Sequence, residues 1–290
     1  MQVKQFSDNA LKFKALNKLA IAIQSGTQSE ALQALKALQG SEAFKGKGWQ
    51  ANFAKLETVL NTGKPEYSIF ALGGNSKLPF VAFSTLPGVT CPGAGACLEF
   101  CYSFRAWRYP AAFMRQAQNA YLMRWHNDVI IADFVTLAQS RPEGFDFRLY
   151  VDGDFSNGAD VALWMETLKA LPHVRAYGYS KSFAALLGYG AFNTWPKNYM
   201  LNISSGHNAS PEMLKYVKEL PIVRGEFIAV SIGKKVKSTD HGKPETNRAL
   251  REAFKVKAFT CPGTCGTCTG KGHACGMQAL KNVPIIIAMH

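Results

Sequence analysis

Residues 147–182 read FRLYVDGDFSNGADVALWMETLKALPHVRAYGYSKS, and this stretch decides the fold. Phe147–Val151 and Val174–Tyr179 are short runs of apolar, aromatic and β-branched residues, which is typical of buried strands. Asp160–Leu171, which lies between them, has the length and composition of a helix. A strand, a helix and a second strand in this order predict two parallel strands joined by a right-handed crossover.

The same alternation continues on both sides of this stretch. Further strands are expected at Tyr199–Ile203, Phe227–Ile232 and Val283–Met289. Tyr67–Leu72 and Leu78–Ser84, with a turn at Gly73–Asn75 between them, are expected to form a hairpin or two short strands. Helices are expected at Pro110–Ser140 with a break near Asn127, and at Phe183–Leu187, Pro211–Leu220 and Arg248–Lys257. Repeated units of this kind predict an α/β fold, either a (β/α) partial barrel or an open, mostly parallel sheet.

The first 66 residues have a different pattern, with leucines at helical spacing. We expect three helices, with Ser29 as the N-cap of the second and Gly63 and Pro65 ending the third. The chain then divides into a helical N-terminal region (1–66), an α/β core (67–257) and a cysteine-rich, metal-binding segment with a closing strand (258–290).

Composition argues against a membrane-spanning protein and for a basic one. The chain has 290 residues, 47% of them hydrophobic, and its longest apolar runs are too short to cross a bilayer. The N-terminus lacks the features of a signal peptide, and an odd number of clustered cysteines favours a reducing compartment, so a cytoplasmic protein is expected. The net charge is +13, and residues 234–281 contain ten Lys or Arg against three Asp or Glu. This basic segment indicates a polyanionic partner, most simply nucleic acid, or else a solvated basic surface.

All seven cysteines fall into two short groups. The first group is in TCPGAGACLEFCY (90–102) and consists of Cys91, Cys97 and Cys101; the second is in TCPGTCGTCTGKGHACG (260–276) and consists of Cys261, Cys265, Cys268 and Cys275. Such clustering predicts metal or iron–sulfur ligation.

The two groups differ in the number of thiols. Three thiolates suit a [4Fe-4S] cluster with one exchangeable iron, or zinc completed by a histidine such as His207 or His273. Four thiolates suit a closed site, either an auxiliary cluster or structural zinc. A single centre shared by both groups is a further possibility at this stage.

Polar residues follow successive expected strands. Asp152 and Asp154 follow one strand, Ser180 and Lys181 the next, and Ser204, Ser205 and His207 the third. Because ligands of parallel α/β sheets bind at the carboxyl ends of the strands, these residues and both cysteine groups are expected at one edge. A separate run, Arg105, Trp107, Arg108 and Tyr109, mixes cations with aromatics as base-stacking surfaces do, although aromatics at a helix start more often belong to a core.

The two cysteine-rich segments and residues 147–182, taken together and in this order, resemble the phage and plasmid gene product 88 family. The resemblance extends from about Tyr67 to Gly276 and implies a phage or plasmid origin without implying a reaction.

The chain is also similar, more loosely, to radical S-adenosylmethionine enzymes, which have a three-cysteine loop after the first strand of a (β/α) barrel. This similarity implies that the first cysteine group holds a [4Fe-4S] cluster whose open iron binds S-adenosylmethionine. Tyr102, Asp152, Gly153, Asp154 and Ser204 would then bind the cofactor, and Asp152, Asp154 and Lys181 would be catalytic. The spacing differs, because five and then three residues separate Cys91, Cys97 and Cys101. The spacing usual in those enzymes occurs instead in Cys261, Cys265 and Cys268.

Three functions follow from these observations. The first is an iron–sulfur enzyme of the radical S-adenosylmethionine type that acts on or near nucleic acid. The second is a zinc-stabilised, non-catalytic nucleic-acid-binding or replication accessory protein. The third is a nuclease or replication accessory in which Asp152 and Asp154 bind a divalent cation.

Overall fold

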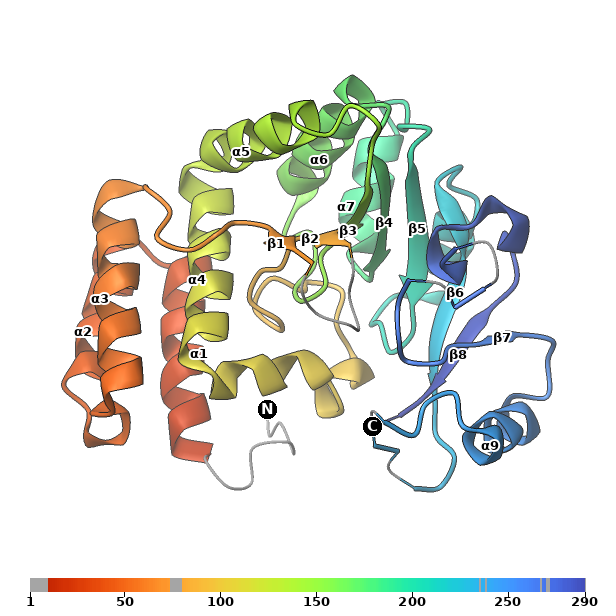
Figure 1. Cartoon of the computed structure of the whole chain (residues 1–290), viewed down its shortest axis with the longest axis horizontal. Coiled ribbons are helices and arrows are strands. Elements are labelled where there is room, and N and C mark those ends of the chain that lie inside the picture. The colour runs from red at the N-terminus through yellow and green to blue at the C-terminus, as the bar shows by residue number, and fades with distance from the viewer. Residues whose placement is uncertain are drawn as a thin grey trace.

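A single open sheet forms the centre of the molecule (Figure 1). The computed structural model describes residues 10–73, 80–234, 236–237, 239–266, 268–269 and 272–289. Within these residues the sheet has eight strands in the order β1-β2-β3-β4-β5-β6-β8-β7, and every neighbouring pair except β1–β2 is parallel. The strands are β1 (Ala71–Leu72), β2 (Val81–Ala82), β3 (Asp146–Leu149), β4 (Arg175–Ser180), β5 (Tyr199–Ser204), β6 (Val223–Val230), β7 (Phe259–Thr260) and β8 (Ile285–Ala288).

Helices connect the parallel strands, as the sequence predicts. They are α4 (Pro110–Trp125), α5 (Asn127–Gln139), α6 (Gly158–Ala170), α7 (Phe183–Gly190), α8 (Pro211–Lys218) and α9 (Pro244–Phe254). Because β2 to β6 are adjacent in chain order, right-handed crossovers place the connecting helices on one face of the sheet. Phe147, Leu149 and Leu201 point to this face and belong to the main hydrophobic cluster with residues of α4 to α8. The mostly parallel α/β fold is therefore confirmed.

The N-terminal region consists of α1 (Ala10–Ser25), α2 (Gln28–Gln39) and α3 (Lys47–Thr62), which pack beside α4 (Figure 1). The expected N-cap at Ser29 is wrong. Thr27 caps α2, because its hydroxyl accepts from the Glu30 backbone N–H at 3.2 Å and the Glu30 carboxylate accepts in return from the Thr27 N–H. Gly63 ends α3 as expected, with φ of 69°. Residues of these helices join the main hydrophobic cluster, and the proposed boundary at residue 66 stays a prediction.

Two strands depart from expectation. β6 begins at Val223, four residues before the predicted start, because the buried Arg224 is fully hydrogen-bonded inside the fold. Its Nε donates to Asn202 Oδ1 at 2.6 Å, and one terminal nitrogen donates to the carbonyls of Leu280 and Val283 at 2.9 Å each. The short strand β7 was not predicted. Leu78 and the Gly74–Asn75 part of the expected hairpin turn lie outside the described residues.

Short 3-10 helices occur mainly in the two cysteine segments. They are η2 (Glu42–Phe44), η3 (Ala96–Glu99), η4 (Tyr102–Arg108), η5 (Ala274–Gly276) and η6 (Gln278–Leu280). In the described part of the chain, no helix is both long enough and apolar enough to span a membrane.

Candidate metal and cofactor site

The first cysteine group and the predicted polar residues lie together at the carboxyl ends of β2 to β5. The Cys91 thiol interacts electrostatically with Asp154 and Lys181, and the Cys101 thiol interacts with Asp152. We call this region the cysteine-loop site; its residues are Cys91, Cys97, Cys101, Tyr102, Asp152, Gly153, Asp154, Lys181, Ser204 and His207. The expected position at this edge of the sheet is therefore found for the first cysteine group and for these polar residues.

Glycines allow the cysteine loop to pack directly on its neighbours. A Cβ added at Gly93 would lie 1.7 Å from the Lys181 carbonyl oxygen, and one at Gly206 would lie 2.8 Å from the Cys97 Cβ. Gly206, whose φ is 75°, also accepts hydrogen bonds from the N–H groups of Gly95 and Cys97 at 3.0 and 3.1 Å. The loop is thus fastened to the ends of β4 and β5, and its glycines are required by this close approach.

Asp154 holds the end of β4 in place. Its side chain is buried, and its carboxylate accepts from Ser180 Oγ at 2.7 Å, Lys181 N at 2.7 Å and Phe155 N at 2.8 Å. Burial raises the pKa of this carboxyl, and the same hydrogen bonds oppose the rise. With both oxygens engaged, Asp154 serves as a positioning residue, and this arrangement disfavours the divalent-cation hypothesis.

Asp152 lies on the other side of Gly153 and has different partners. Its Oδ2 accepts from Gln116 Nε2 at 3.0 Å, and Gln116 Oε1 accepts from Trp107 Nε1 at 3.1 Å. Burial raises the pKa of Asp152, whereas Ser103, Arg148 and Gln116 lower it. Gly153 has φ of 80°, and a Cβ there would lie 2.1 Å from Thr85 Oγ1. Sequence reasoning missed Gln116, whose only signal is a polar residue on a buried helix.

Lys181 and His207 face each other across the end of β5. Lys181 Nζ donates to Ser204 Oγ at 2.6 Å. His207 Nδ1 accepts from the Ala209 N–H at 3.3 Å, and the His207 ring packs against Phe183 with centroids 5.0 Å apart. Burial and the Lys181 charge lower the pKa of His207, so its imidazole is neutral at pH 7. A neutral imidazole and an ammonium group therefore flank the cysteine loop.

The three thiols of the first cysteine group lie near one another. Cys101 interacts electrostatically with Cys91 and Cys97. Burial raises the pKa of Cys91 and Cys101, while hydrogen bonds from Gly88 and Ser103 oppose the rise, as they would favour thiolates. All seven cysteines belong to the described residues, and none is in a disulfide. Among the described residues, no three His, Cys, Asp or Glu side chains are arranged to hold one metal ion.

The second cysteine group lies over the face of the sheet opposite the connecting helices. The Asn202 side chain, in the middle of β5, donates to the Cys275 carbonyl at 3.0 Å, and Arg148 of β3 donates to Cys265 Sγ at 3.8 Å. The expectation that this group would sit at the carboxyl edge is therefore wrong. The reason is packing, because this segment covers Tyr177 and Ile285, which would otherwise expose apolar surface.

The thiols of the second group form a connected set. Cys261 interacts electrostatically with the other three, namely Cys265, Cys268 and Cys275. Backbone N–H groups of Gly263 and Ala274 donate to Cys261 Sγ and Cys268 Sγ at 3.4 and 3.3 Å. Burial raises the pKa of Cys275 to about 11 and that of Cys261 to about 12. N–H donors to sulfur are a feature of protein metal–thiolate sites.

Arg148 lies between the two cysteine groups. Its guanidinium packs over the Tyr179 ring at 4.8 Å and interacts electrostatically with Asp152 and Tyr102 at one end and with Cys265 at the other. The His273 ring packs at a tilt against Tyr177, with centroids 4.3 Å apart, so His273 belongs with the second group. These neighbours favour two separate centres. An arginine between Phe147 and Leu149 was the only sequence signal for this role.

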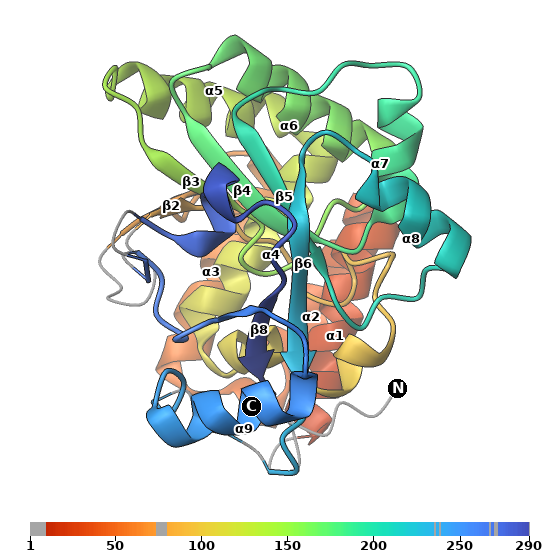
Figure 2. The ribbon, with the colours of Figure 1, turned by 90° about the vertical axis from the view of Figure 1, so that its right-hand side faces the viewer.

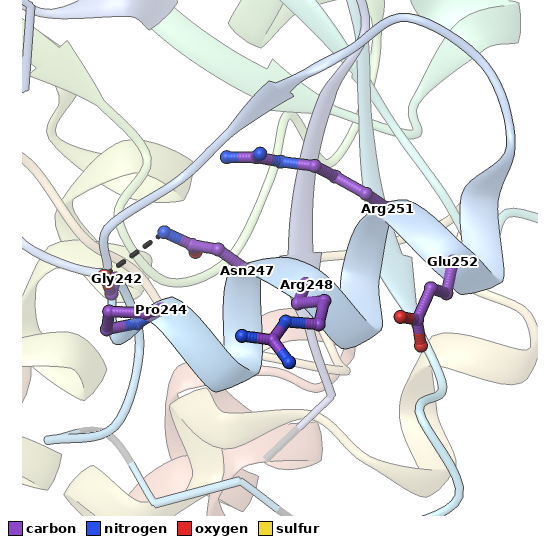
Figure 3. A pocket seen from close by; sticks show the side chains of 6 residues that line it. All are labelled: Gly242, Pro244, Asn247, Arg248, Arg251 and Glu252. Atoms are coloured by element: carbon purple, nitrogen blue, oxygen red, sulfur yellow. Dashed lines mark hydrogen bonds between the residues drawn. The ribbon is translucent and has the colours of Figure 1, made fainter.

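A surface pocket of about 620 Å³ lies along α9 (Figure 3), and it is lined by Gly242, Pro244, Asn247, Arg248, Arg251 and Glu252. Asn247, Arg248 and Arg251 extend from the helix around it, and Asn247 Nδ2 donates to the Gly242 carbonyl at 3.1 Å. This pocket lies in the basic segment that the sequence singled out.

Comparison with protein families shows to which family the chain is related. A family model described as gene product 88 matches residues 50–232, which is more than half of the chain. The chain belongs to the gene product 88 family. The matched range begins within α3 and ends just after β6, so it contains the cysteine-loop site but not the second cysteine group. The matched range therefore begins and ends earlier in the chain than the expected resemblance over about 67–276. No curated protein and no solved structure matches the chain.

Proposed function

We propose that this chain is an iron–sulfur protein, a radical S-adenosylmethionine-like enzyme of phage or plasmid origin that acts on or near nucleic acid. The observation that carries the proposal is the position of the first cysteine group. Three thiols follow β2, the first of five parallel strands that are adjacent in chain order, and they lie beside polar side chains from the ends of β3, β4 and β5.

The number of thiols in the first cysteine group suits a [4Fe-4S] cluster, in which each thiolate binds a different iron. Cys91, Cys97 and Cys101 would hold three irons and leave one iron accessible. When bound, such a cluster supplies one-electron reduction of S-adenosylmethionine.

Side chains of the cysteine-loop site would orient that cofactor. The ammonium group of Lys181, which lies near Cys91 and bonds Ser204, suits a carboxylate. Asp152, with its Oδ2 fixed by Gln116, suits an amino group, and Tyr102 is 42% exposed at the same site. Asp154 would act indirectly, since it fixes the backbone of Lys181.

The second cysteine group would hold an auxiliary cluster or a structural zinc. Its four thiols, two of which accept backbone N–H groups, equal the number of thiolate ligands that either centre requires. The segment covers the face of the sheet with few apolar residues of its own. A bound metal would therefore contribute to folding as well.

Charge supports a polyanionic substrate. Arg248 and Arg251 line the α9 pocket in a segment that carries more than half of the net charge of +13. Such a surface would steer a nucleic acid toward the protein. The cytoplasm, where thiols stay reduced, is the compartment that this chemistry requires.

Anaerobic purification with metal analysis tests the proposal. We expect brown protein with about four irons per cluster, and an electron paramagnetic resonance signal that changes when S-adenosylmethionine is added. Cys97→Ala should remove that response and leave the second centre loaded, whereas Cys265→Ala should empty the second centre. Colourless protein that holds zinc would refute the enzyme and establish the zinc-stabilised nucleic-acid-binding protein instead.

A further inference from the structure

We propose that the exposed side of η4 binds single-stranded nucleic acid and leads it to the cysteine-loop site. This inference rests on the proposed function and deepens it, because it names the class of substrate. Its starting point is position, since η4 begins at Tyr102, immediately after Cys101.

The 3-10 geometry of η4 sorts its residues into two rows. Residues three apart line up on such a helix, and Tyr102, Arg105 and Arg108 form an exposed row. Phe104 and Trp107 form the opposite row and are only 3% and 1% exposed. Tyr109, which follows directly, is 67% exposed. We call Tyr102, Arg105, Arg108 and Tyr109 the η4 strip.

The buried row makes the strip a rigid platform. The Phe104 and Trp107 rings pack edge to face at 5.1 Å, and Phe13 of α1 contacts both rings at 5.3 and 5.2 Å. Trp107 Nε1 also donates to the buried Gln116 of α4 at 3.1 Å. A strip held in this way loses little conformational entropy when a ligand binds. The expectation that aromatic residues at a helix start belong to the core therefore holds for Trp107 but not for Tyr109.

The charge around the strip matches a phosphate backbone. Arg105 and Arg108 are both exposed on the strip, and residues 100–127 contain no acidic residue. Arginine pairs with phosphate through two parallel hydrogen bonds, and exposed aromatic rings stack with any base. An acidic peptide would pair with the arginines but would have no base to stack on the tyrosine rings. A duplex would hide its base faces, so the combination favours a single strand.

The strip also leads toward the proposed chemistry. Tyr102 Oη donates to the Val151 carbonyl at 3.5 Å, which ties the strip to the loop that carries Asp152. In Figure 1, η4 is the yellow segment before α4 in the lower part of the view, and α9 lies at the lower right. Figure 2 also places α9 at the lower end of the molecule, below β8. A strand bound on η4 would lie next to the cysteine loop, because Cys101 directly precedes η4.

Fluorescence anisotropy with a labelled single-stranded DNA oligonucleotide tests this inference. The full-length chain is titrated at several salt concentrations. Arg105→Ala/Arg108→Ala should weaken binding and make the slope of log K against log salt shallower by about 1.4, since each phosphate contact on a single strand contributes about 0.7. Lys36→Ala/Lys47→Ala, on α2 and α3, removes the same charge and should leave the slope unchanged.

Substitutions of Tyr109 distinguish the contribution of base stacking to binding from the contribution of charge. Tyr109→Ala should weaken binding about tenfold, whereas Tyr109→Phe keeps the ring and should bind as the unmodified chain does. Equal slopes for both double variants, or full binding by Tyr109→Ala, would overturn the inference. A polyglutamate peptide that loses affinity for Tyr109→Ala as strongly as the oligonucleotide does would overturn it too.

Iron content and the response to S-adenosylmethionine are measured on the same samples. Single-strand binding without iron would refute the proposed enzyme and leave the η4 strip intact. A loaded, responsive protein that binds no oligonucleotide would refute the strip and leave the enzyme intact.

Discussion

Replacing Gly93 with alanine should separate the cysteine loop from the end of β4. An added Cβ would lie 1.7 Å from the Lys181 carbonyl oxygen and 2.4 Å from the carbonyl carbon. Ordinary contacts between carbon and a carbonyl oxygen begin near 3.3 Å, so the loop must move by about 1.5 Å. Backbone atoms on both sides leave no flexible side chain that could yield instead.

The expected magnitude follows from two effects. Overpacking of this kind costs about 1–3 kcal/mol. The displacement also strains the hydrogen bond from Asn208 N to the Gly93 carbonyl, 3.1 Å long, which contributes about 1 kcal/mol. Together they should lower the free energy of unfolding by about 2–4 kcal/mol and the melting temperature by about 5–10 °C. The first centre should lose iron as well, because Cys91 and Cys97 flank this position.

Gly188 provides the matched control. It lies in α7 with no atom within 4 Å of an added Cβ. Gly188→Ala should therefore be neutral or stabilise the chain by up to about 1 kcal/mol. Urea denaturation and iron analysis compare both variants with the unmodified chain. If Gly93→Ala matches Gly188→Ala in both measurements, the loop is not packed on Lys181 as described and the argument for a shared site fails.

Three further predictions follow from other contacts. Thr27→Ala removes the capping box of α2 and should lower the free energy of unfolding by about 1 kcal/mol in urea, with unchanged metal content; full stability would contradict the cap. Cys265→Ala should lose metal by elemental analysis and become sensitive to protease. If the metal is structural zinc, the lost binding free energy is on the order of 10 kcal/mol. A variant with native metal content would contradict this role. Burial raises the pKa of Asp160, so its contribution to stability is full below the unfolded pKa of about 3.9 and falls as pH rises through the higher folded pKa. Asp160→Asn should gain stability relative to the unmodified chain as pH rises from 4 to 7, and a difference independent of pH would refute this sign.

Local signals predicted most of the fold. The alternation of apolar strands and helical segments identified the parallel order, and Gly63 marked the end of α3. The strand-end rule also predicted that Asp152, Asp154 and Lys181 would meet the first cysteine loop. These features depend on residues near one another in sequence, or on a rule that holds for any parallel sheet.

The parts that sequence reasoning missed depend on distant partners. The expected strand began at Phe227 and left out Arg224, whose hydrogen bonds come from Asn202 and from the carbonyls of Leu280 and Val283. Gln116 gains its role from Asp152, which lies 36 residues away. The position of the second cysteine group over the sheet could not be read from its spacing, since spacing reports ligand number and not the surface on which a loop packs.

The sequence by itself determined that seven thiols form two groups, and that the first group follows a strand of a parallel sheet. Only the tertiary structure decided the partners of the two carboxylates that follow β3. Asp152 and Asp154 are equivalent in the sequence, on either side of one glycine. In the folded chain Asp154 accepts from Ser180 and Lys181 at the end of β4 and from the adjacent Phe155 N–H, whereas Asp152 accepts from Gln116 of α4 and interacts with Ser103 and Arg148. The physical reason is that a buried carboxylate needs hydrogen-bond donors, and most of these donors come from segments that are distant in the sequence.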